Sequence, residues 1–191
     1  MLKRNNLFVI LFFVLFFNLG CPQKEKGEPA PFFNELYFKY KEGTIGNNYI
    51  MYRLNEIGSK YEIIKEDISP TFPGTTKYMV DLWGFIKKAP IVTRTKRKWT
   101  KSKSWIGTRI GIWLPTSELL AGNKLTTSII GKCRVEEKTI WEKWEVWLLK
   151  DGLGNEYYYD VKTGFWVGCN IHNISGGKKT ILIDTNADIP Y

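Results

Sequence analysis

The 191-residue chain has few side chains of the kinds that enzymes use for catalysis. His172 is its only histidine, which excludes zinc sites built from several histidines and leaves a serine–histidine–aspartate arrangement a single base. The sequence has neither a G-x-S-x-G nucleophile motif nor a G-x-x-x-x-G-K-[ST] phosphate loop. We therefore predict no catalytic residue, no metal site and no cofactor, and we expect His172 on the surface.

Two cysteines fall in segments with the alternating pattern of strands. If the domain is exported, Cys133 and Cys169 are expected to form a disulfide, because oxidising compartments permit such bonds. Closing the loop between them would contribute about 4 kcal/mol in the chain-entropy model. Two buried thiols are the alternative, and neither arrangement is a catalytic site.

A basic run is the clearest local feature of the chain. It spans residues 94–103 and contains no acidic residue. Extended backbone would place Arg94 and Lys98 on one face and Arg97 and Trp99 on the other, so we expect an exposed hairpin or sheet edge. Either this edge contacts an anionic membrane surface, or its charge only keeps the sheet soluble. The candidate contact residues are Arg94, Lys96, Arg97, Lys98, Trp99, Lys101 and Lys103.

Aromatic residues concentrate in the last third of the chain. If residues 141–150 form one strand, Trp141 and Trp147 lie on one face and Trp144 on the other. One face could then pack in the core while the other meets a ligand. The three tryptophans are therefore candidates for an aromatic ligand face, with ordinary packing as the alternative.

The first residues predict export. Lys3 and Arg4 precede an unbroken apolar run over residues 7–17, which is the pattern of a secretory signal peptide. The run is shorter than the roughly 20 apolar residues that span a bilayer. We assign residues 1–20 to the signal peptide.

Residues 18–21, Asn-Leu-Gly-Cys, resemble the lipobox of bacterial lipoproteins. This resemblance implies that Cys21 is acylated, becomes the new N-terminus and anchors the protein in a membrane of the cell envelope. An unlipidated exported protein is the alternative. Residues 22–31, rich in proline and charge, complete a flexible tether over 21–31.

The remaining residues, 32–191, are enough for a single domain with its own core. The formal net charge of the chain is +9, and removal of Lys3 and Arg4 with the leader leaves +7. A basic protein can bind anionic lipid, nucleic acid or acidic glycans. Export makes nucleic acid an unsuitable partner, so we predict contact with lipid and none with nucleic acid.

Short alternating segments separated by turn residues predict a mainly β domain. We expect hairpins around Gly58-Ser59, residues 151–155 and residues 161–164, and one short helix over 78–88. One or two strands are predicted over 92–114, with regular alternation from Trp105 onward. A further helical turn is predicted at 117–120. The pattern favours a single curved antiparallel sheet, either an open barrel or a sandwich.

The last 60 residues resemble exported β-rich prokaryotic proteins of uncharacterised function. The resemblance rests on residues 157–160 (Tyr-Tyr-Tyr-Asp), 163–165 (Thr-Gly-Phe) and the apolar strand that follows. Some proteins of this kind are similar to the half-open barrels of periplasmic lipoprotein carriers. The resemblance implies a curved sheet with a hydrophobic concave side.

The sequence supports three functional hypotheses. The first is a non-enzymatic envelope lipoprotein that binds an apolar or amphipathic ligand, or a partner protein. An envelope glycan hydrolase is the second, although adjacent acids such as Glu136 and Glu137 point to opposite faces of a strand and cannot form a catalytic pair. A purely structural surface protein is the third.

Overall fold

A computed structural model describes residues 35–43, 47–95, 97–122, 124–174 and 176–187. The predicted signal peptide, Cys21 and the tether lie outside these ranges. The strands are β1 (Leu36–Glu42), β2 (Tyr49–Ile57), β3 (Lys60–Ile68), β4 (Gly74–Asp81), β5 (Ile86–Arg94), β6 (Arg97–Thr100), β7 (Lys124–Thr127), β8 (Gly131–Trp141), β9 (Trp144–Asp151), β10 (Glu156–Asp160), β11 (Trp166–Ile171) and β12 (Lys178–Thr185). The helical elements are η1 (Lys103–Trp105) and α2 (Thr116–Leu120).

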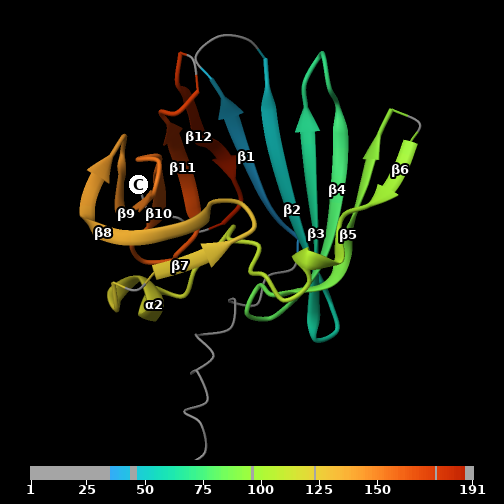
Figure 1. Cartoon of the computed structure of the whole chain (residues 1–191), viewed down its shortest axis with the longest axis horizontal. Coiled ribbons are helices and arrows are strands. Elements are labelled where there is room, and N and C mark those ends of the chain that lie inside the picture. Colours follow the sequence, from blue (N-terminus) through green and yellow to red (C-terminus); the bar gives the residue numbers. More distant parts are fainter. Residues whose placement is uncertain (1–34, 44–46, 96, 123, 175, 188–191) are drawn as a thin grey trace, which may run out of the picture.

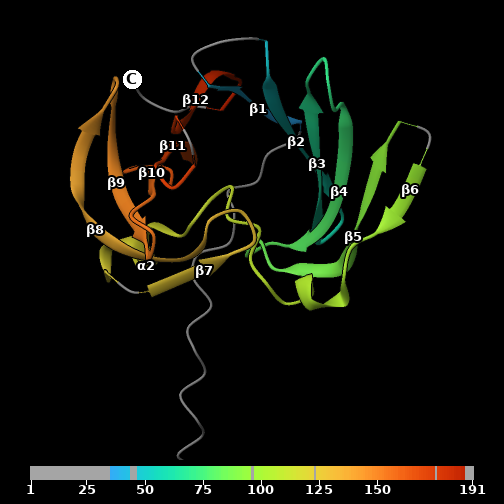
Figure 2. The ribbon, with the colours of Figure 1, turned by 45° about the horizontal axis from the view of Figure 1, so that its top comes forward.

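All twelve strands form one antiparallel sheet in the order β6-β5-β4-β3-β2-β1-β12-β11-β10-β9-β8-β7. Two six-stranded meanders thus meet where the first strand pairs with the last. The sheet curls so that its two wings face each other, but β6 and β7 remain separate edges (Figures 1 and 2). This confirms the predicted mainly β fold with a single curved antiparallel sheet.

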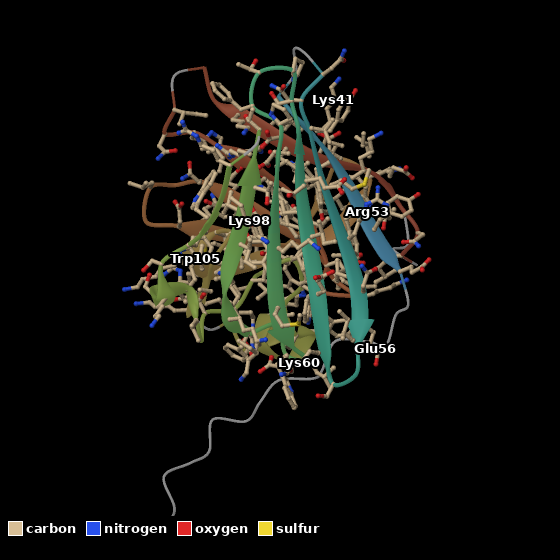
Figure 3. All side chains as sticks on the ribbon, turned by 90° about the vertical axis from the view of Figure 1, so that its right-hand side faces the viewer. Lys41, Arg53, Glu56, Lys60, Lys98 and Trp105 are labelled. Carbon is tan, nitrogen blue, oxygen red and sulfur yellow. The ribbon has the colours of Figure 1, made fainter. Side chains whose placement is uncertain are left out.

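Alternation along the central strands gives the sheet a buried concave face. On β1, Leu36, Phe38 and Tyr40 are buried, and the residues between them are partly exposed. The β1–β2 register places Phe38 opposite Tyr52 and Tyr40 opposite Ile50, so these side chains share the concave face. The outer face of the β2–β5 wing carries charged side chains such as Arg53 (Figure 3).

The connection over residues 107–115 fills the interior between the wings. The backbone N–H of Ile110 donates to the carbonyl of Gly84 (2.9 Å) at one side, and that of Leu114 donates to the carbonyl of Gly164 (2.8 Å) at the other. Ile110, Ile112 and Leu114 are fully buried. The segment is therefore part of the core and ties the two meanders together.

This segment is not the regular strand that its alternation predicted. Gly107 and Gly111 both take φ +83 and interrupt the extended backbone. As a result Trp113 is buried beside the isoleucines, while Ile106 is exposed.

An ion pair between a buried arginine and a partly exposed glutamate fixes the interior segment to α2. The Arg109 guanidinium donates to both carboxylate oxygens of Glu118, at 2.6 and 2.9 Å. It also lies 4.7 Å from the centre of the Phe85 ring. Such a bidentate pair combines geometric specificity with charge.

The helix predicted over 78–88 is wrong, because these residues form the end of β4, a turn and the start of β5. The side chain of Asp81 accepts hydrogen bonds from the backbone N–H groups of Trp83 and Phe85, both at 3.0 Å. Gly84 takes φ +81 in this turn. Local capping and sheet pairing override the helical spacing of apolar residues.

The predicted hairpin turns and the predicted short helical turn are confirmed. Gly58 and Ser59 connect β2 to β3, residues 152–155 connect β9 to β10, and residues 161–165 connect β10 to β11. The predicted helical turn at 117–120 is α2. Within the described ranges, neither helical element has the length or the apolar character to cross a bilayer.

Candidate functional site

A cavity of about 280 Å³ opens on the concave face of the sheet. Both wings contribute to its wall, and so does the segment that follows β6. The aromatic and aliphatic part of the wall includes Ile50, Tyr52, Tyr78, Trp166 and Ile171. Polar and charged residues make up much of the remaining wall, so the cavity combines the apolar surface and the polar groups that small-molecule sites use.

Aromatic contacts across the β1–β12 junction hold this wall in place. The Tyr40 ring stacks on Trp166 with 4.5 Å between centroids, and its hydroxyl donates to the Trp166 carbonyl at 2.7 Å. Tyr52 meets the edge of Tyr40 at 5.9 Å. Burial raises the pKa of Tyr40 and Tyr52 well above the ordinary value of 10.0 and that of Tyr78 to about 12. These phenols are therefore neutral at physiological pH.

Charged residues surround the apolar wall. Lys178 forms an ion pair with Glu42 (2.6 Å), and Lys65 forms one with Asp67 (2.6 Å). Glu42 is the single carboxylate among the lining residues that the structure describes. The site therefore does not bring together the two facing acids that a glycoside hydrolase needs.

The basic run and η1, which begins at the end of this run, each supply one further residue to the cavity. Lys101 and Trp105 both line it, and the Lys101 ammonium lies 4.0 Å from the centre of the Trp105 ring. Burial lowers the pKa of Lys101, the positive charges of Lys65 and Arg94 lower it further, and Asp67 opposes them. Lys101 is thus a partly desolvated cation beside an apolar cavity.

The rest of the basic run forms the predicted exposed hairpin, but with different faces. Residues 94 and 97 are cross-strand partners, as are Val92 and Trp99. Arg94, Arg97 and Trp99 therefore share the concave side, whereas Lys98 lies on the other face. The prediction that Arg94 and Lys98 share a face is wrong, because the chain reverses between β5 and β6. Lys103 is exposed, and Lys96 lies outside the described residues.

The three candidate tryptophans do not lie on one strand. The chain turns at residues 142–143, so Trp141 on β8 pairs with Trp144 on β9. Trp141 stacks on Tyr158 on the outer face, with 4.2 Å between centroids. Trp147 lies across from Tyr159, whose hydroxyl donates to the interior segment. None of the three lines the cavity that the structure describes.

The predicted disulfide is absent from the structure, where Cys133 and Cys169 are separate buried thiols. They lie on β8 and β11, which β9 and β10 separate. Three strand spacings amount to about 14 Å, twice the roughly 7 Å between Cα atoms that a disulfide allows. Burial raises the pKa of Cys133 to about 12 and that of Cys169 to about 11. Both thiols are therefore protonated and poorly reactive.

His172 is exposed, as expected, and is not among the residues that line the cavity. Its Nε2 is 3.4 Å from Glu156, which also accepts a hydrogen bond from the Tyr158 hydroxyl at 2.6 Å. Burial acts to raise the pKa of Glu156, but hydrogen bonds from Tyr158, Asn170, His172 and Lys150 outweigh it and lower the pKa to about 2. This cluster is a surface network around an ionised carboxylate.

Comparisons of the chain with protein-family models, curated proteins and solved structures find no match. Fold and cavity together still define a structural class. The described chain is a single open, curled antiparallel sheet with a cavity on its concave side.

Proposed function

We propose that this protein is a membrane-tethered lipoprotein of the cell envelope that binds an amphipathic ligand in its concave cavity without enzymatic chemistry. The observation that carries the proposal is that one cavity combines a neutral aromatic wall with a cationic rim, which consists of Lys65, Lys101 and Lys178. The resemblance of residues 18–21 to a lipobox supports the tether.

The wall suits the apolar part of such a ligand. At about 280 Å³, the cavity is near the lower end of the roughly 300–1,000 Å³ typical of small-molecule sites. Each methylene that it removes from water contributes about 0.8 kcal/mol. A single acyl segment therefore fits the size and chemistry of the site better than a folded partner does.

Filling the cavity is expected to weaken the binding of a neutral amphiphile. Trp166 and Trp105 line the site, so titration with decanol should change the tryptophan fluorescence of the wild-type protein in a saturable way. Ile171 also lines the cavity and is partly buried. Ile171→Trp should weaken decanol binding by at least about tenfold, because the larger ring occupies the space of the alkyl chain.

Ile183 provides the matched control, because it is 47% exposed on β12. Ile183→Trp should bind decanol as the wild type does. Equal binding by both variants, or no saturable change with the wild type, would contradict the proposed site.

The exposed hairpin is proposed to contact the anionic surface of the membrane that holds the tether. Arg97, Lys98 and Lys103 are exposed there, and Trp99 is 44% exposed. Each charge near an anionic surface contributes about 1 kcal/mol. In a chain without the lipid (Cys21→Ala), changing these three cations to Gln should weaken binding to phosphatidylglycerol vesicles by at least about tenfold.

Added salt should weaken the wild-type binding in the same assay. A control with the same net charge replaces exposed lysines outside the hairpin, namely Lys60, Lys132 and Lys162. If this control loses as much binding as the hairpin variant, net charge alone accounts for the attraction, and the hairpin only keeps the sheet soluble.

A further inference from the structure

The cations at the rim outnumber the carboxylates that compensate them. Lys65 and Arg94 share Asp67, at 2.6 and 3.6 Å, and Lys178 pairs with Glu42. Lys101 takes part in no ion pair within the described ranges. Together with Lys101, these groups leave two positive charges in excess.

Lys101 is held at the cavity by its backbone and by its side chain. Its N–H donates to the Pro90 carbonyl at 2.8 Å, which extends the β5–β6 pairing beyond the end of β6. Its ammonium lies over Trp105, and both side chains line the cavity. The charge is therefore positioned at the wall rather than free in solvent, unlike that of Lys98 on the opposite face of the hairpin.

An anion beside Lys101 would offset both the desolvation of its ammonium and the repulsion by neighbouring cations. The ammonium is partly removed from water, and the repulsion by the positive charges of Lys65 and Arg94 outweighs the attraction by Asp67. In a partly desolvated site, an opposite charge interacts more strongly than it does in bulk water. Hydrogen-bond donors lie nearby, because the Tyr52 and Tyr78 phenols are neutral and line the same cavity.

We infer that the cavity selects amphiphiles with an anionic head group, and that Lys101 recognises this group while the aromatic wall holds the apolar chain. The inference rests on the proposed function and specifies its ligand class. A fatty-acid carboxylate and a lipid phosphate share this chemistry. The anion and the chain must belong to one molecule, because the cation and the wall belong to one cavity.

A pair of ligands with the same chain tests the inference. Decanoate and decanol are titrated into the Cys21→Ala chain at about pH 8, where the carboxylate is ionised, with tryptophan fluorescence as the readout. The wild-type cavity should bind decanoate at least about tenfold more tightly than decanol. Lys101→Met keeps the length of the side chain but removes the charge, so it should erase this preference by weakening decanoate binding much more than decanol binding.

Lys98→Met is the matched control, because it removes a positive charge from the same hairpin on the opposite face. It should retain the preference for decanoate. Decanol binding without a preference for decanoate, or a preference that survives Lys101→Met, would overturn the inference and leave the proposed function intact. Absence of saturable binding by both ligands would instead overturn the proposed function.

Two further titrations separate the sources of the anion. Acetate and inorganic phosphate should not compete with decanoate, because they lack the chain that fills the cavity. Competition by either at a concentration similar to that of decanoate would show a site for free anions and overturn the inference. Decyl phosphate binding as tightly as decanoate, with the same dependence on Lys101, would extend the ligand class to phospholipid head groups.

Discussion

Gly164→Ala is expected to lower the free energy of unfolding by about 2–5 kcal/mol. Gly164 takes φ +69, and an added Cβ would lie 2.0 Å from the carbonyl oxygen of Leu114. The positive φ costs an alanine roughly 1–2 kcal/mol, and relief of the clash adds about 1–3 kcal/mol. The neighbouring backbone cannot easily move, because the N–H of Leu114 donates to the Gly164 carbonyl at 2.8 Å.

Urea denaturation followed by circular dichroism measures this loss, and Gly154→Ala is the matched control. Gly154 takes φ +79, but an added Cβ there would meet nothing within 4 Å. The control should lose only the roughly 1–2 kcal/mol that the positive φ costs. Equal losses in the two variants would show that contact with the interior segment contributes little to stability.

Cys21→Ala is expected to transfer the full-length protein from the membrane fraction to the soluble fraction of a bacterial host. Acyl chains on Cys21 would bury many methylenes, each contributing about 0.8 kcal/mol, and two or more chains give stable anchoring. The weaker, charge-dependent attraction of the hairpin should not survive a high-salt wash. Fractionation with and without that wash therefore separates the two modes of attachment.

Mass spectrometry of the wild-type N-terminus should show an acylated Cys21. Cys169→Ala is the control, because it also removes a thiol but leaves residue 21 intact, and it should stay in the membrane fraction. Wild-type protein that begins at another residue, or that carries an unmodified Cys21, would reject lipid anchoring. A mutant that stays in the membrane after the high-salt wash would do the same.

Local turns were predictable because short-range chemistry determines them. Gly58-Ser59 and the turn at residues 161–164 were predicted from the sequence, since glycine supplies positive φ. In the structure the Asp160 side chain also caps the backbone of the residues that follow it. The same chemistry explains the failure at residues 78–88. There the capping residue Asp81 and Gly84 form a turn, whereas the apolar spacing alone suggested a helix.

The sequence did not show which residues of the basic run share a face of the sheet. A single reversal of the chain within the run changes which residues lie together. An uninterrupted strand would put Arg94 and Lys98 on the same face. The chain instead turns after β5, with Thr95 at φ 52, and Arg94 becomes the partner of Arg97. A turn that no glycine or proline marks leaves no clear pattern in the sequence. The reversal after Trp141, with Glu142 at φ 55, was missed for the same reason.

The sequence by itself determined a mainly β chain with a basic hairpin and predictable turns, because alternation and turn chemistry act between near neighbours. Only the tertiary structure decided which residues form the cavity. Pairing of β1 with β12 brings Tyr40 against Trp166, and the reversal after β5 carries Lys101 to the rim. These contacts depend on sheet order and curvature, which join residues more than a hundred positions apart and leave no regular spacing in the sequence.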